Sequence, residues 1–257
     1  MADFKGGSDF GMNVAKKYLV IGASSEVGCA FIKDLLLKQE QISVFAHFAH
    51  NRENLNQLAD EFQETDFTIV QADLEKQEDT DKLIEEIRKW GCPDALVYLP
   101  AGKFEYLKLK NLSWDIMERE LSISVRGFAL VCKAVLPLMA GQRYGKVAVM
   151  LTEYTLGMPP KFMPHYITAK YALLGFMKAM ASEYGKKGIN INALSPAMIE
   201  TKFLSNIDER IIEMNGERNS LNRNVKIEEV VRGLQFLLSD GSDYMSGVNL
   251  NMSGGNY

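Results

Sequence analysis

Short apolar runs alternate with helical patterns along almost the whole chain, and this alternation limits the fold more than any other feature. The apolar runs are KKYLVIG, ISVFAHF, FTIVQADL, DALVYLPAG, KVAVML, INALSP and VNLNM. Strands that are buried on both faces have this character, and most of the segments between them space their apolar residues as helices do. The pattern predicts an α/β fold, with a doubly wound parallel sheet covered by helices on both faces.

The size of the chain fits one such domain. It has 257 residues, of which 47% are hydrophobic and 24% are charged. We expect residues 1–13 to form a flexible N-terminal tail and residues 14–257 to form the domain. A polar segment at about 199–223 contains no strand pattern, and it suits a mobile helical flap over a site.

Charge and cysteine usage argue against several classes of function. The formal net charge is −4 and basic residues do not cluster, so we expect no nucleic-acid partner. Cys29, Cys92 and Cys132 are scattered, without a CxxC motif or histidines at ligand spacing, so we expect neither a disulfide framework nor a metal site. The N-terminal sequence lacks a signal-peptide pattern and no later apolar run reaches membrane-spanning length. We therefore expect a cytoplasmic protein with no membrane partner.

A glycine-containing loop follows the first predicted strand and opens the first predicted helix. Its sequence is IGASSEVG, residues 21–28. Backbone N–H groups in such a turn, together with the helix N-terminus, favour a bound phosphate. The loop therefore predicts a nucleotide site.

The order of this loop and the later motifs resembles the short-chain dehydrogenase/reductase family, most closely its 3-oxoacyl-[acyl-carrier-protein] reductases, from about residue 16 to residue 257. IGASSEVG resembles the family's T-G-x-x-x-G-x-G with Glu26 in place of the middle glycine, LPAG resembles N-N-A-G, and SPAMIETKF resembles S-P-G-x-x-x-T. The resemblance implies a Rossmann-like dinucleotide-binding and catalytic domain. It also implies a set of cofactor-binding residues: Gly22, Ser24, Ser25, Glu26, Val27, Gly28, His50, Arg52, Asp73, Leu74, Pro100, Ala101, Gly102, Tyr166, Lys170, Pro196, Met198, Ile199 and Thr201.

The motif YITAK carries the predicted chemistry. Tyr166 and Lys170 are four residues apart in a predicted helix, so they project from one face. An ammonium group near a phenol stabilises the phenolate and lowers the pKa of the phenol, which makes it a better acid at neutral pH. The resemblance implies that Tyr166 protonates a ketone oxygen and that Lys170 also contacts the nicotinamide ribose.

The family's catalytic serine has two candidate replacements. Counting back from Tyr166 at the family spacing reaches Glu153, whereas counting along the strand KVAVML reaches Thr152. A hydroxyl can donate to a developing oxyanion and an ionised carboxylate repels it, so we predict Thr152, with one residue inserted before Tyr166. The alternative is that Thr152 is only a strand-end residue. Ser124 falls at the family's asparagine position, where a helix kink and a backbone carbonyl serve a proton relay.

The residues after the second predicted strand favour NADP(H) over NAD(H). The family's NAD-dependent members place an acidic residue there to bind the ribose hydroxyls, whereas this chain has Phe48 followed by His50 and Arg52. The alternative is that the two basic residues are the solvated start of a helix. We interpret Glu26 as a tolerated substitution that turns its side chain outward and leaves the backbone donors of the loop free.

Together these motifs predict an NADPH-dependent reductase that transfers hydride to a ketone, with a 3-oxoacyl thioester as the leading substrate. The alternatives are a dehydrogenase or reductase of a sugar or other secondary alcohol, and a non-catalytic nucleotide-binding scaffold. The ketone would be a small molecule or be bound to a carrier protein, for which Arg143 and Lys187 are candidate docking residues. The helices FALVCKAVLPLM and YALLGFMKAMA are apolar over more than one stripe, which predicts a homotetramer or a homodimer.

Overall fold

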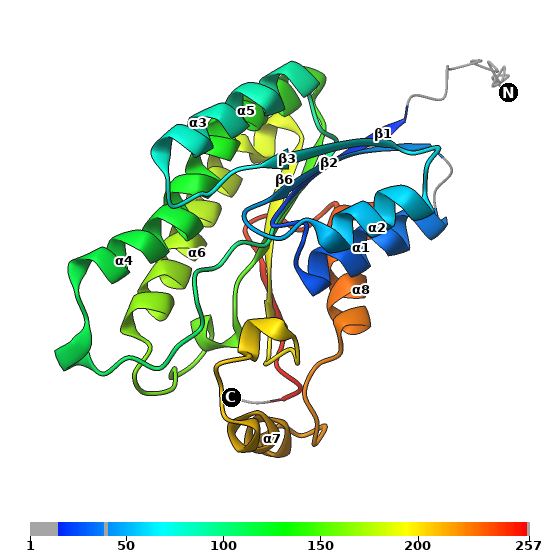
Figure 1. The fold of residues 1–257 in the computed structure, drawn as a ribbon. Coiled ribbons are helices and arrows are strands. Elements are labelled where there is room, and N and C mark those ends of the chain that lie inside the picture. Colours follow the sequence, from blue (N-terminus) through cyan, green and yellow to red (C-terminus); the bar gives the residue numbers. More distant parts are fainter. Residues whose placement is uncertain (1–14, 39–40, 256–257) are drawn as a thin grey trace, which may run out of the picture.

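A seven-stranded parallel sheet forms the centre of the molecule (Figure 1). The computed structural model describes residues 15–38 and 41–255, so the predicted tail at 1–13 lies outside the described residues. The strand order is β3-β2-β1-β4-β5-β6-β7, and every pair of neighbouring strands is parallel. The predicted doubly wound α/β architecture is confirmed.

The elements follow the predicted alternation closely. The strands are β1 Lys16–Ile21, β2 Ile42–Phe48, β3 Asp66–Gln71, β4 Ala95–Tyr98, β5 Gly145–Met150, β6 Ile189–Pro196 and β7 Asn249–Met252. The α-helices are α1 Glu26–Lys38, α2 Glu53–Glu61, α3 Gln77–Trp90, α4 Trp114–Leu121, α5 Gly127–Gln142, α6 Pro164–Tyr184, α7 Glu209–Arg218 and α8 Ile227–Leu238.

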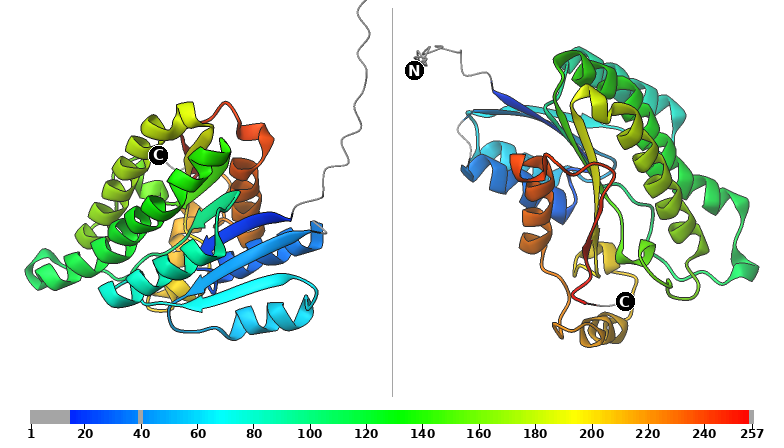
Figure 2. Two further views of the ribbon diagram at one scale, coloured as in Figure 1. Left: turned by 90° about the horizontal axis from the view of Figure 1, so that it is seen from above. Right: turned by 180° about the vertical axis from the view of Figure 1, so that it is seen from behind.

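Alternate strand residues divide the interior into two cores. In β1, Leu19 and Ile21 pack toward α3, α5 and α6, whereas Tyr18 and Val20 pack toward α1, α2 and α8. Successive side chains of a strand point to opposite faces of the sheet, so a strand that is covered on both sides must be apolar throughout. Figure 2 shows the two helical layers on opposite faces of the sheet.

The chain reverses its direction of winding at β1. The chain leaves β1 for β2 and β3 on one side and returns to place β4 on the other side. In sheets of this kind the loops at the carboxyl ends of the two diverging strands separate and leave a crevice. The loop after β1 and the loop after β4 therefore border one space.

One helical region, α4, was not predicted, whereas the flap was expected to be helical. Helix α4 begins at the N-cap Ser113, whose hydroxyl accepts from the backbone N–H of Ile116, and it continues into a π-helical turn, Ser122–Arg126. The predicted flap at 199–223 holds a 3-10 turn, Lys202–Leu204, and α7. Helix α4 has only eight residues, and this window is too short for its apolar periodicity to stand out in the sequence.

The continuous helical segment from residue 114 to residue 142 corrects the expectation that no apolar run reaches membrane-spanning length. It is 29 residues long, and its most apolar 18-residue window has a mean hydropathy of 1.7, which passes the test of length and composition for a bilayer span. Half of its most apolar window is buried within the fold. A core helix that covers a parallel sheet has the same character, because its apolar residues pack on the sheet.

His47 in β2 connects the loop after β1 to the end of β3. Its Nδ1 accepts from the Gly22 N–H at 3.2 Å, and its Nε2 donates to the Ala72 carbonyl at 2.9 Å. Both bonds require the neutral ring, and burial lowers the pKa of His47 to about 4. The sequence analysis did not single out this residue, because one histidine in an apolar strand has no distinctive spacing.

We predict that His47 makes the protein less stable in acid. Between pH 6.5 and about 4 the unfolded chain binds a proton at His47 that the folded chain does not bind, so acidification lowers the free energy of unfolding, by up to about 3 kcal/mol. The variant H47Q should show a shallower decline in chemical-denaturation midpoints over this range. The matched control H50Q, at an exposed histidine, should keep the wild-type slope, and an equal slope in H47Q would contradict the prediction.

Candidate active site

A cavity of about 660 Å³ opens at the carboxyl ends of the strands, where β1 and β4 diverge. It is bordered by the loops after β1, β2, β3, β4, β5 and β6, and by the start of α6 and the flap. The predicted site residues that line it are Gly22, Ser24, Ser25, Glu26, Val27, His50, Asp73, Leu74, Pro100, Ala101, Gly102, Thr152, Tyr166, Lys170, Pro196, Met198, Ile199 and Thr201. The fold therefore brings most of the predicted residues to one space.

The loop after β1 directs the N-terminus of α1 toward this cavity. Gly22 has φ +81°, a left-handed conformation that favours glycine, and a Cβ there would lie 3.3 Å from Leu99 and Pro100. The Ser25 hydroxyl donates to the Gly22 carbonyl at 2.9 Å and accepts from the Gly28 N–H at 3.0 Å. The turn is thereby closed by its own side chain, and α1 begins at the next residue, Glu26.

Gly28 does not line the cavity, and its predicted role in cofactor binding stays a prediction. A Cβ at this position would lie 2.6 Å from the Ala23 carbonyl oxygen, closer than a real Cβ can approach. The absence of a side chain allows α1 to pack directly on the loop that precedes it. Gly28 therefore contributes to the turn by permitting this close packing.

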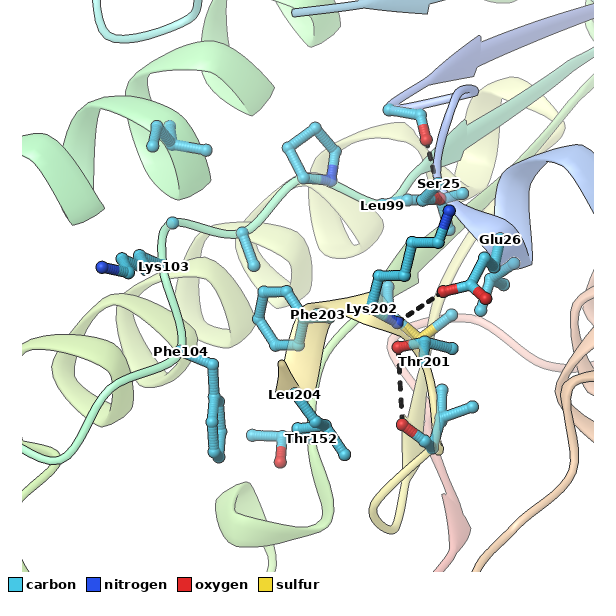
Figure 3. Close-up of a pocket in the computed structure, with 18 of the residues that line it drawn as sticks. Ser25, Glu26, Leu99, Lys103, Phe104, Thr152, Thr201, Lys202, Phe203 and Leu204 are labelled. Atoms are coloured by element: carbon cyan, nitrogen blue, oxygen red, sulfur yellow. Dashed lines mark hydrogen bonds between the residues drawn. The ribbon is translucent and has the colours of Figure 1, made fainter. Parts of the chain in front are cut away.

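Glu26 reaches across the cavity mouth, as Figure 3 shows. Its carboxylate accepts from the Lys202 backbone N–H at 2.6 Å, which joins the first turn of α1 to the flap. The side chain thus lies beside the cavity with a specific partner, and the interpretation that it simply turns outward was incomplete. The sequence separation of 176 residues explains why no local pattern indicated this contact.

The two basic residues after β2 lie in different environments. His50 lines the cavity, together with the neighbouring Asn51 and Asn54, which the sequence analysis did not identify. Arg52 is exposed, donates from Nε to Asn56 Oδ1 at 2.7 Å, and does not line the cavity. This bond directs the guanidinium along α2, and the predicted role of Arg52 in cofactor binding stays a prediction.

Tyr166, Thr152 and Lys170 meet on one wall of the cavity. Tyr166 and Lys170 come from α6, where Lys170 Nζ lies 5.7 Å from the centre of the Tyr166 ring, and Thr152 follows β5. The Thr152 side chain hydrogen-bonds Tyr166. This contact supports the choice of Thr152 over Glu153, and the structure accommodates the additional residue in a 3-10 turn, Glu153–Thr155.

Burial dominates the electrostatics of this wall. It raises the pKa of the Tyr166 phenol well above its ordinary value, and the bond from Thr152 opposes this only in part. Burial also lowers the pKa of Lys170 to about 8. Burial therefore outweighs any lowering of the Tyr166 pKa by Lys170, and the expected net lowering is absent in this arrangement. The phenol stays protonated at neutral pH, which is the form that can donate a proton.

Ser124 lies in the π-helical turn, is buried and does not line the cavity, and its predicted role stays a prediction. The helix irregularity expected at this position is present. Tyr98 stabilises it, because its hydroxyl donates to the Ile123 carbonyl, which the wider turn leaves accessible. Ile123 lines the cavity in place of Ser124.

An aromatic group borders the catalytic wall and was not recognised as a unit from sequence. Phe104, after β4, contacts the Tyr166 ring edge-on at 5.4 Å and the Phe203 ring at 5.5 Å. Leu204 and Met198 complete this apolar surface, part of which Figure 3 displays. These residues come from the loop after β4 and the segment after β6, so only the fold brings them together.

Comparison with known proteins identifies the family. A family model described as enoyl-(acyl carrier protein) reductase matches residues 22–256. The dehydrogenase/reductase SDR family member 4 of Rattus norvegicus is 31% identical over 191 residues, which cover 73% of this chain and 68% of that protein. The chain belongs to the short-chain dehydrogenase/reductase family. It is an NAD(P)-dependent oxidoreductase.

Further similarities extend over nearly the full length of this short-chain dehydrogenase/reductase. The 3-oxoacyl-[acyl-carrier-protein] reductase FabG of Thermotoga maritima is 28% identical over 248 residues, which cover 93% of this chain and 97% of that protein. The structure of 4-hydroxyisoleucine dehydrogenase complexed with NADH superposes with a TM-score of 0.84 at 24% identity, covering 93% of this chain and 98% of that one.

The residues present fit a nicotinamide dinucleotide. The cavity runs from the turn at Gly22 and the N-terminus of α1, where unsatisfied N–H groups favour a phosphate, to Tyr166 and Lys170. Asp73 lines the middle of this path. One continuous wall would thus hold the nicotinamide ring beside Tyr166 and the phosphates at the N-terminus of α1.

We predict that the Thr152 hydroxyl contributes directly to turnover. T152V keeps the shape of the side chain but removes the donor, so kcat should fall by about 100- to 1000-fold with cofactor affinity unchanged. E153Q should have a mild effect, and Y166F should abolish turnover while binding persists. Steady-state kinetics and cofactor fluorescence titrations measure both quantities. A fully active T152V beside an inactive E153Q would assign the role to Glu153.

Proposed function

We propose that this protein is an NADPH-dependent reductase of ketones, with a 3-oxoacyl thioester as the leading substrate. The observation that carries the proposal is the convergence of Tyr166, Thr152 and Lys170 on one buried wall of the cavity. A non-catalytic scaffold has no requirement for a protonated phenol hydrogen-bonded to a hydroxyl at the base of a nucleotide site.

The side chains account for the proton and the charge in this reaction. When bound, the reduced nicotinamide supplies hydride to the carbonyl carbon. Tyr166 donates its phenolic proton to the carbonyl oxygen, which completes a secondary alcohol, and Thr152 steadies the negative charge that develops on that oxygen. The Lys170 ammonium favours the phenolate that remains after the transfer.

The apolar surface beside Tyr166 supports an acyl substrate. Phe104, Met198, Phe203 and Leu204 offer an alkyl chain a place from which water is excluded. The similarity to a 3-oxoacyl-[acyl-carrier-protein] reductase supports the same choice. A sugar would require more polar partners than this surface provides.

The predicted docking residues for a carrier protein lie elsewhere. Arg143 precedes β5 and Lys187 precedes β6, so both lie at the amino edge of the sheet, opposite the cavity. A single subunit therefore does not place them beside its own cavity. Lys103 is exposed and lines the cavity, and it is the better candidate to meet an anionic group on the substrate or its carrier.

Assembly of the enzyme into a homotetramer or homodimer is part of the proposal. Leu138 on α5 and Tyr171 on α6 are large apolar residues with 40% and 44% of their surfaces exposed. A second subunit packed on the exposed faces of α5 and α6 would cover these residues.

A panel of ketones tests the proposed activity. NADPH absorbance should decline on addition of 3-oxoacyl thioesters faster than with sugars or other small ketones at equal concentration. Consumption of a sugar substrate in preference to every thioester would overturn the substrate assignment. Binding of NADPH without turnover of any member of the panel would overturn the reductase assignment.

The choice of NADPH generates a separate prediction at the end of β2. No carboxylate from residues 48–52 can repel a 2′-phosphate, and His50 lines the cavity there. H50A should weaken NADPH binding several-fold more than NADH binding, and the difference should shrink at high salt. R52A is the matched control and should change neither affinity greatly. Equal losses for the two cofactors in H50A would exclude a role in reading the phosphate.

A further inference from the structure

Lys170 carries its amino group into the interior of the protein. Only 1% of the residue is exposed, and Nζ donates to the Met150 carbonyl at 3.0 Å. Removing an ammonium from water is costly, and a single neutral carbonyl offsets this cost only in part. A buried lysine in this position loses its proton readily unless an opposite charge lies near it.

Glu120 supplies such a charge from the last turn of α4. The residue is 0% exposed, and its carboxyl group packs on the backbone of Gly102, in the loop after β4. A Cβ at position 102 would overlap the carboxylate, so glycine is required for this approach. The negative charge of Glu120 favours the protonated form of Lys170. The glycine of the LPAG motif therefore makes room for a buried carboxylate on α4, and α4 packs against α6, the helix that carries Lys170.

We propose that Glu120 is a positioning residue for the reaction, the buried counter-ion that keeps Lys170 protonated while the site turns over. The proposal rests on the proposed reductase function, because it assigns Lys170 its charge in that reaction. Glu120 acts through Lys170, and it does not line the cavity.

Burial and the charged groups around Glu120 determine its pKa and therefore the pH range in which it is ionised. Burial raises the pKa of Glu120 to about 7, while Lys170 on α6 and Arg119 on α4 lower it and Glu105, after β4, raises it. Glu120 is therefore ionised above about pH 7, and Lys170 remains an ammonium up to about pH 8. The two opposite charges coexist between these values. Without the carboxylate, the pKa of Lys170 falls further.

The pH profile of E120Q tests the proposal. This variant keeps the size of the side chain and removes its charge, so the alkaline limb of kcat/KM for a 3-oxoacyl thioester should move to lower pH by on the order of one unit. E118Q, two residues earlier on α4 and exposed, is the matched control and should keep the wild-type limb. An unchanged limb in E120Q, or an equal loss at every pH, would overturn the proposal.

The variant E120D covers the case in which E120Q does not fold. Aspartate keeps a carboxylate, but its shorter side chain holds the charge farther from Lys170. The alkaline limb of E120D should therefore lie at a lower pH than that of the wild type. Where E120Q folds, the limb of E120D should lie at a higher pH than that of E120Q. A limb identical to that of the wild type in E120D, with no folded E120Q to compare, would overturn the proposal.

A measurement without substrate separates this inference from the proposed function. Because the folded pKa of Glu120 lies above its unfolded value, the carboxyl lowers stability as pH rises from about 4.5 to about 7. His47 contributes the opposite slope equally in all three proteins, so the change in denaturation midpoint of the cofactor-free protein from pH 4.5 to pH 7 should be more positive in E120Q than in the wild type or E118Q. An equal pH dependence of the denaturation midpoint in E120Q and in the wild type would contradict a buried Glu120 carboxyl with a raised pKa. A wild-type protein that turns over no ketone would refute the function alone.

Discussion

The parallel pairing of β1 with both β2 and β4 is the constraint on which the site depends. Because the chain winds away from β1 in two directions, the loops that follow β1 and β4 cannot cover each other's strand ends. Gly22 brings the first loop close to Leu99 and Pro100 without filling the space beyond them. The cavity, the exposed N-terminus of α1 and the approach of the flap all follow from this one junction.

Burial of polar groups is what makes this cavity chemically active. Tyr166 and Lys170 lie on the interior side of α6, where the loss of water raises the pKa of the phenol and lowers the pKa of the ammonium. The fold offsets these costs locally, with Thr152 on the phenol and Glu120 near the ammonium. The same low-dielectric surroundings strengthen each of these contacts, so the wall acts as a unit rather than as separate residues.

Contacts between distant segments give this member of the family its own character. Glu26 replaces a family glycine, and its carboxylate binds the backbone of Lys202 in the flap. A glycine could not make this bond. The loop that faces the phosphates and the flap that covers the substrate are therefore mechanically linked, and a negative charge lies where a polyanionic cofactor is expected. The substitution is both a structural connection and an electrostatic cost.

The sequence alone indicated the parallel sheet, the alternation of strands with helices, and the position of Tyr166 and Lys170 on one face of a helix. It could do so because periodicity and a four-residue spacing are local properties of the chain. It also indicated Thr152, since the hydroxyl is the group the chemistry needs. It did not indicate that Gly28, Arg52 and Ser124 lie off the cavity wall, because their neighbours in the fold decide where they lie. Only the tertiary structure brought Glu120 to Lys170 and Glu26 to Lys202, because these contacts join elements that are far apart in the chain. Burial, which governs the charges of the site, is a property of the assembled fold.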